Sequence, residues 1–126
     1  YPTMLQMANL PLKPAQHVDG VSLLPLLRQK GKLKRKAIYW HYPHYHGSGN
    51  KPSGAIRAGD YKLIEWYENN SVELYNLKDD IGEKDDLAAK MPDKAGELRR
   101  MLHRWLRQTG ATVPTPEQLR AFTQKK

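Results

Sequence analysis

The stretch from Gly54 to Leu87 constrains the fold of this chain more than any other part of the sequence. It reads GAIRAGDYKLIEWYENNSVELYNLKDDIGEKDDL, and its β-branched and aromatic runs are separated by turn residues. Gly59-Asp60 is typical of a two-residue hairpin turn, and residues 68–71 are typical of a polar turn. Runs bounded in this way predict consecutive antiparallel strands at Ala55–Ala58, Tyr61–Tyr67 and Val72–Leu77.

A further strand and a long helix flank this stretch. Residues 37–42, AIYWHY, predict a strand that Pro43 ends, because proline cannot donate to a β-ladder. Apolar residues recur at helical spacing from Pro92 to about Thr109, and Gly110 is a helix stop. The predicted fold class is α+β: a small antiparallel sheet of about four strands with this C-terminal helix packed on one face.

The alternation of apolar and polar residues along the strands is imperfect. Leu63 and Glu65 share one face of the predicted strand, whereas Ile64 and Trp66 share the other. We therefore expect both faces of the sheet to be partly covered. Trp40, Trp66 and Trp105 lie in apolar elements and are expected in the core.

Composition limits what such a chain can be. Its 126 residues suffice for one modest core, and no apolar run approaches the roughly 18 residues that cross a bilayer. The absence of cysteine excludes disulfides and thiolate metal sites. The chain begins at Tyr1, in what reads as a helix, so we expect an upstream part to be missing.

Basic residues give the chain a net charge of +8 and suggest an anionic partner. They gather at residues 30–36 and along the predicted long helix, with an acidic segment at residues 79–86 between them. A stand-alone basic module that binds a polyanion is therefore one possible function. The aromatic-basic motif of RNA-binding sheets is missing from the sequence, so we predict no nucleic-acid partner.

Five motifs in series resemble a known family. IRAGDYKLIEW, VELYNLKDD and EKDDLA are similar to the run R-x-G-x-Y-K-L, E-L-Y-D-L, D-P-x-E-x-x-N-L-A that closes the sulfatases of the alkaline-phosphatase-like superfamily. YPTMLQMANLPL and HVDGVSLLPLL resemble the helix that ends the catalytic domain of these sulfatases and the segment that follows it. Asn76, Ile81 and Asp86 depart from the family pattern but keep its turn or capping chemistry.

The resemblance implies that the chain is the C-terminal subdomain of a sulfatase, a fragment of a larger α/β protein. Residues 1–29 would be the end of the catalytic domain and a linker, residues 30–110 the subdomain, and residues 111–126 a tail. The parent reaction would be hydrolysis of a sulfate ester, with a sulfated sugar as one candidate substrate. A phosphate or phosphonate ester hydrolase of the same superfamily is the nearer alternative. The family suggests a periplasmic or extracellular location.

The chemistry of that family depends on groups that we expect elsewhere. A formylglycine, made from Cys or Ser in a C/S-x-P/A-x-R motif, acts beside a calcium ion held by carboxylates. Both are expected in a missing N-terminal catalytic domain, which would be the main partner of this chain. We expect no match to this motif in the chain, and therefore assign no catalytic residue here. We also assign no metal ligand, because residues 79–86 lack the ligand spacing of an EF-hand. The fragment alone should be inactive.

The segment WHYPHYH is the candidate substrate-facing element. It carries His41, His44 and His46 without the spacing of a zinc site. Imidazoles can hydrogen-bond sugar hydroxyls or pair with sulfate when protonated, but they can equally satisfy backbone groups at the end of a strand. His44 and His46 follow Pro43 and should lie nearer solvent, whereas His41 is expected to be structural.

Asn50, Lys51 and Arg57 are secondary candidates for substrate binding, because loops on rigid scaffolds often carry such residues. Arg57 has a second interpretation. Its place in the predicted hairpin suits an ion pair with Glu65 or Glu73 on a neighbouring strand.

Overall fold

The computed structural model describes residues 1–123 and, for side chains, residues 1–121. It divides the chain into two compact units, Tyr1–Lys36 and Ala37–Lys126, each of which is described by itself. The boundary predicted from sequence lay at residue 29. Residues 124–126 of the predicted tail lie outside the described residues. No helix in residues 1–123 combines the length and apolar character needed to cross a membrane.

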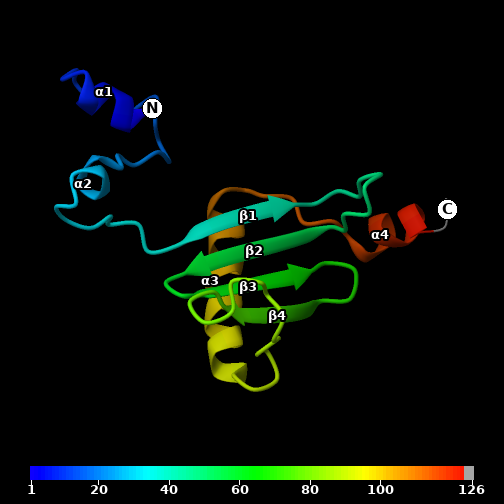
Figure 1. The fold of residues 1–126 in the computed structure, drawn as a ribbon. Helices are drawn as coiled ribbons and strands as arrows, with labels where there is room; N and C mark the ends of the chain where they lie inside the picture. Colours follow the sequence, from blue (N-terminus) through cyan, green and yellow to red (C-terminus); the bar gives the residue numbers. More distant parts are fainter. Residues whose placement is uncertain (124–126) are drawn as a thin grey trace. The chain divides into compact units, whose positions relative to one another are not determined.

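The larger unit is built on a four-stranded antiparallel sheet (Figure 1). Its strands follow the order of the sequence, which confirms the predicted meander, and each boundary lies within two residues of the predicted one. They are β1 (Ile38–Tyr42), β2 (Ser53–Ala58), β3 (Tyr61–Trp66) and β4 (Ser71–Asn76).

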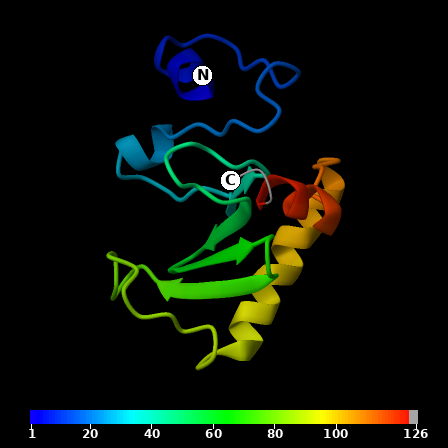
Figure 2. The same cartoon turned by 90° about the vertical axis from the view of Figure 1, so that its right-hand side faces the viewer.

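One face of the sheet is the core. Ile56, Leu63 and Leu74 are direct neighbours across three strands and are fully buried. The helix α3 (Pro92–Gln108) lies across this face, as predicted, with Leu98 and Leu102 fully buried against it (Figures 1 and 2). Each such leucine contributes about 2 kcal/mol of hydrophobic free energy, so this single layer holds helix and sheet together.

The opposite face of the sheet carries the side chains between these core positions. No helix among residues 37–123 covers it, and Trp40 on β1 is half exposed. The prediction that Trp40 lies in the core is therefore wrong. Trp66 on the same face is half-buried, whereas Trp105 stacks on Tyr39 on the α3 side, with ring centroids 4.9 Å apart.

Backbone N–H groups that donate to acidic side chains order the acidic segment after β4. Asp80 accepts from the backbone N–H groups of Lys84 and Asp85 at 2.7 and 2.9 Å. These hydrogen bonds hold the pKa of Asp80 below its usual value, and the bond from the N–H of Asp85 has the largest effect. Asp86 accepts from the N–H groups of Leu74 and Ala88, which ties the segment back to β4.

The smaller unit contains two short helices, α1 (Pro2–Met7) and α2 (Leu24–Leu27). The N–H of Leu23 donates to Thr3 Oγ1 at 2.9 Å and joins them. In the larger unit, a helix that the sequence did not predict, α4 (Pro116–Thr123), occupies half of the predicted tail, with Leu119 buried.

Candidate functional site

The candidate site lies at one end of the sheet. Tyr42, which ends β1, is paired with Ser53, which begins β2, and Ser53 is paired with Trp66 at the end of β3. The loop 43–52 and the turn 67–70 therefore leave the sheet at the same end. The segment that follows α3 also reaches this end, because Thr112 accepts a hydrogen bond from His41.

His41 uses both of its ring nitrogens within the chain. Nε2 lies 3.1 Å from the carbonyl oxygen of Thr112, and Nδ1 lies 2.8 Å from the hydroxyl of Tyr67. A carbonyl oxygen can only accept, so Nε2 carries a proton, and in the neutral ring Nδ1 accepts from the Tyr67 hydroxyl. Burial, and next the charge of Glu65, raise the pKa of Tyr67, which keeps this hydroxyl protonated. This geometry favours the structural interpretation of His41.

Glu68 fixes the loop 43–52 from the neighbouring turn. One carboxylate oxygen accepts from the hydroxyl of Tyr45 at 2.9 Å, and the other pairs with Nζ of Lys51 at 2.9 Å. Burial of the ring and the bond to Glu68 raise the pKa of Tyr45, so its hydroxyl remains a donor. The backbone N–H of Tyr67 also donates to the carbonyl of Pro52. The loop is thus held at both ends before any ligand arrives.

His44 and His46 are exposed on this fixed loop. The ring of His44 packs edge-on against Tyr42, with centroids 5.9 Å apart. Nδ1 of His46 accepts from the N–H of Ser48 at 3.2 Å, so the neutral ring carries its proton on Nε2. No described residue contacts that Nε2 by a hydrogen bond, and it remains available as a donor.

Asn50 closes the same loop through its backbone. Its carbonyl oxygen accepts from the N–H of His46 at 3.2 Å, while its side chain is exposed and has no hydrogen-bond partner among the described residues. The structure therefore places His44, His46 and Asn50 on one loop, residues 43–52, which is longer than the predicted loop over residues 47–54.

A hollow of about 240 Å³ opens beside this loop. His44 and Tyr45 form one wall. The other wall is formed by Thr112 and Pro114, in the segment that leads into α4, and by Gln118 of α4 itself. Imidazole, hydroxyl and amide groups at the edge of an apolar hollow suit a sugar ring with polar substituents. Sequence reasoning missed this second wall, although the tail carries a signal for a helix start. Thr115 and Gln118 form a capping box, in which the N–H of Thr115 donates to Gln118 Oε1 at 2.8 Å and the N–H of Gln118 donates to Thr115 Oγ1 at 3.3 Å, and Pro116 lies at the first helical position.

Arg57 lies away from this group. It is near the far end of β2, about 13 Å along the strand from Ser53 at roughly 3.3 Å per residue. The predicted ion pair with Glu65 or Glu73 is wrong. Glu65 points to the α3 face, and Glu73 accepts instead from Trp66 Nε1 and the Tyr75 hydroxyl.

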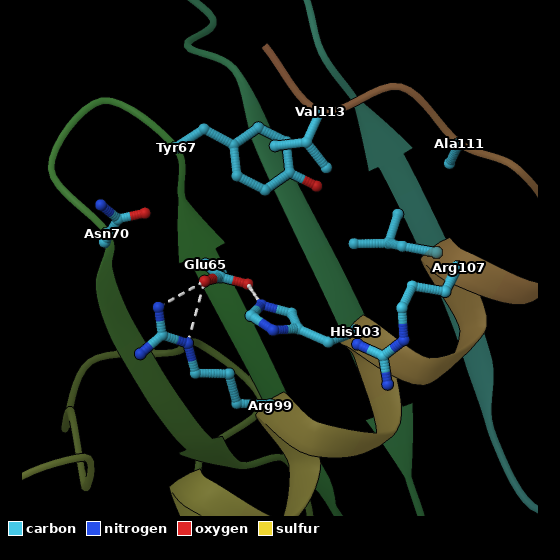
Figure 3. A pocket seen from close by; sticks show the side chains of 9 residues that line it. Glu65, Tyr67, Asn70, Arg99, His103, Arg107, Ala111 and Val113 are labelled. Atoms are coloured by element: carbon cyan, nitrogen blue, oxygen red, sulfur yellow. Dashed lines mark hydrogen bonds and ion pairs between the residues drawn. The ribbon is translucent and has the colours of Figure 1, made fainter. Parts of the chain in front are cut away.

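Glu65 is the centre of a charged cluster that the sequence did not reveal. Its carboxylate is 2% exposed and accepts from Arg99 Nε and Nη2 at one oxygen and from His103 Nε2 at the other. Arg99 and His103, one helical turn apart on α3, both point at Glu65 from the wall of a hollow of about 290 Å³ (Figure 3). Both oxygens are occupied, so this cluster joins α3 to β3 rather than offering a carboxylate to a ligand.

The letters of the C/S-x-P/A-x-R pattern occur at Ser53–Arg57, SGAIR, so the prediction that the chain contains no match to this pattern is wrong. These residues form β2, which is hydrogen-bonded to a strand on each side. Among the described residues no three His, Asp or Glu side chains gather in a way that could hold a metal ion. The match therefore lacks the carboxylates that a calcium-assisted nucleophile needs, and neither formylglycine nor calcium fits these residues.

Comparison with known proteins gives a consistent result. Residues 1–112 match the family described as N-sulphoglucosamine sulphohydrolase, C-terminal. A sulfatase of Formosa agariphila is 36% identical over 84% of this chain, and human arylsulfatase K is 33% identical over 82%. A protein solved in complex with its substrate, D-glucosamine-2-N,6-O-disulfate, is 32% identical over 85% of this chain, with a TM-score of 0.66. This chain spans only 22%, 20% and 23% of the lengths of these three proteins.

Proposed function

The chain belongs to the sulfatases, as a C-terminal sulfatase subdomain, and on that basis we propose that it completes a sulfuric ester hydrolase and lines the substrate side of its cleft. The observation that carries the proposal is the family match over residues 1–112, together with the short span of the chain in each relative. A separate N-terminal catalytic domain is then the main partner.

We propose that the loop 43–52 binds the organic part of the sulfate ester. His46 offers Nε2–H to a hydroxyl or sulfate oxygen, and His44 offers its exposed ring at the mouth of the hollow. The anchoring of the loop by Glu68 supports this role, because a loop held in place before binding loses less entropy when a ligand arrives.

A sulfated amino sugar is the substrate class that we propose. One relative, from Bacteroides thetaiotaomicron, is an N-acetylglucosamine-6-O-sulfatase, 33% identical to this chain, and the solved protein described above holds a glucosamine disulfate. The polar groups and aromatic rings around the hollow agree with a sugar, since hydroxyls need hydrogen-bond partners and sugar faces pack on aromatic rings.

The sulfate chemistry is assigned to the catalytic domain. Formylglycine and calcium would supply the nucleophile and neutralise the sulfate charge there. In the part of this chain whose side chains are described, no three His, Asp or Glu residues gather in a way that could hold the metal. Its own residues bind and orient the sugar. A periplasmic or extracellular location is part of the same proposal.

The test uses the full-length protein that carries this chain. We expect it to release inorganic sulfate from a 6-O-sulfated glucosamine, measured by ion chromatography. The matched 6-phosphate ester is the control substrate. Release of phosphate at a higher kcat/KM than sulfate would instead support the phosphate ester hydrolase.

A further inference from the structure

The hollow of about 290 Å³ beside α3, which we call the α3 hollow, carries more positive than negative charge. Arg99 uses Nε and Nη2 for Glu65, and its Nη1 has no hydrogen-bond partner among the described residues. Arg107 lies one helical turn after His103 and borders the same hollow, where it forms no ion pair with a described residue (Figure 3). One carboxylate therefore faces two guanidinium groups, so the hollow has an excess of positive charge.

The remaining sides of the α3 hollow are uncharged. Asn70, in the turn between β3 and β4, borders it, and its side chain has no hydrogen-bond partner among the described residues (Figure 3). Leu106, Ala111 and Val113 form an apolar part. A guanidinium binds a carboxylate or sulfate through two parallel hydrogen bonds, and the apolar part can contact the carbon skeleton of the same ligand. This combination suits an organic anion better than an inorganic ion.

A third hollow connects the α3 hollow with the candidate loop. It measures about 240 Å³ and is bordered by Tyr45, Tyr67 and Asn70. It shares Tyr45 with the hollow beside the loop, and it shares Tyr67 and Asn70 with the α3 hollow. Glu68 also borders it, but its carboxylate is paired with Lys51, so it repels an anion less than a free carboxylate would. These adjoining hollows can hold successive units of one chain-like ligand.

We propose that the α3 hollow binds a second, anionic sugar unit of the substrate, which carries a carboxylate or a sulfate. The proposal rests on the proposed function, which places the first sugar at the loop 43–52. The substrate class is then an acidic oligosaccharide. Arg107 binds the anionic group of the second unit by charge-assisted hydrogen bonds, and it selects the oligosaccharide over a single sulfated sugar, which reaches only the loop.

Hydrolysis of two substrates by the full-length protein tests this assignment. One is 6-O-sulfated glucosamine, and the other is a tetrasaccharide that ends in the same sugar and carries a carboxylate or sulfate on each further unit. We expect wild type to prefer the tetrasaccharide, and Arg107→Ala to lower the ratio of the two kcat/KM values about tenfold. Arg104→Ala is the matched control. It removes an equal charge from an exposed residue of α3 that does not border the hollow, so it should leave the ratio unchanged.

Binding without turnover separates this proposal from the proposed function. Isothermal titration calorimetry of the full-length protein uses a tetrasaccharide of uronic acids, which carries carboxylates and no sulfate ester. We expect Arg107→Ala to weaken its binding about tenfold, whereas Arg104→Ala should change the Kd by less than about twofold. Inorganic sulfate should bind at least about tenfold more weakly than the tetrasaccharide, because it makes no contact with the apolar part of the hollow.

Two results would overturn the proposal. Equal effects of Arg107→Ala and Arg104→Ala, on the ratio of kcat/KM values or on binding, mean that the oligosaccharide responds only to the overall charge. Binding of inorganic sulfate as tight as that of the tetrasaccharide means that the hollow holds a free anion. A protein that binds the uronic-acid tetrasaccharide through Arg107 but releases no sulfate would support the site and overturn the proposed function alone.

Discussion

Glu68 positions the candidate loop without touching the candidate ligand groups themselves. Its two oxygens hold Tyr45 and Lys51, which lie on either side of His46 in the loop. Both contacts are at the surface, so their loss should change stability by less than about 1 kcal/mol. We expect these contacts to strengthen ligand binding instead, because they restrict the motion of the loop in the free protein.

We therefore predict that Glu68→Ala raises KM for a sulfated sugar about fivefold, while kcat and the melting temperature change little. Steady-state kinetics of the full-length protein measures this. Glu68→Gln keeps an acceptor for Tyr45 and should recover most of the loss. Unchanged KM in Glu68→Ala would show that the loop is either rigid without Glu68 or remote from the substrate.

Glu65, unlike Glu68, contributes to the stability of the fold and not to ligand binding. Glu65→Ala should lower the free energy of unfolding by about 2–3 kcal/mol, because it removes a buried acceptor from Arg99 and His103. The value is at the low end for a buried pair, since both partners are partly exposed. Urea denaturation is the measurement, with Glu97→Ala as the control for a surface pair with Lys94. Equal losses in the two variants would contradict a structural role for the cluster.

The elements of this fold differ in how far the sequence predicts them. The strands and α3 were predicted because their apolar spacing and turn residues agree locally, as in Gly59-Asp60 between β2 and β3. The cluster at Glu65 could not be predicted, because its partners lie 34 and 38 residues away and meet only when α3 packs on the sheet. The exposure of Trp40 was missed for a similar reason. The burial of a strand residue depends on which other elements cover the strand, and the sequence of the strand itself does not determine this.

The acidic segment between β4 and α3 has a predictable response to pH. The folded-state pKa of Asp80 is lowered by the N–H groups that its carboxylate accepts, so ionised Asp80 stabilises the native loop. That stability is present above the unfolded-state pKa, near 4, and is lost as the pH falls through the lowered folded-state value.

Asp80→Asn should therefore reduce stability at neutral pH and remove part of the acid dependence below about pH 4. Urea midpoints measured between neutral pH and about pH 3 would show this. Asp60→Asn, in the turn between β2 and β3, is the control, because its carboxylate accepts no hydrogen bond from a described residue. An unchanged acid dependence in Asp80→Asn would mean that the loop is ordered by other contacts.

The whole molecule combines a basic surface with an incomplete site. Its net charge of +8 would suit a polyanion, but the family match assigns the chain to a longer enzyme. The proposed sulfated substrate agrees with both observations, because a positive surface attracts an anion. The Ser53–Arg57 match illustrates the limit of short motifs, since its letters are present while the surrounding site is not.

The most direct test of this account compares two substrates in the full-length protein. We predict that the double variant His44→Ala/His46→Ala lowers kcat/KM for 6-O-sulfated glucosamine by about tenfold, which corresponds to about 1.4 kcal/mol of lost hydrogen bonding. Hydrolysis of a small aryl sulfate, which lacks the sugar hydroxyls, should stay within about twofold of wild type, as should both activities of the control variant Gln108→Ala. Equal kcat/KM values of wild type and double variant on the sulfated sugar would contradict a place for this subdomain in the substrate cleft.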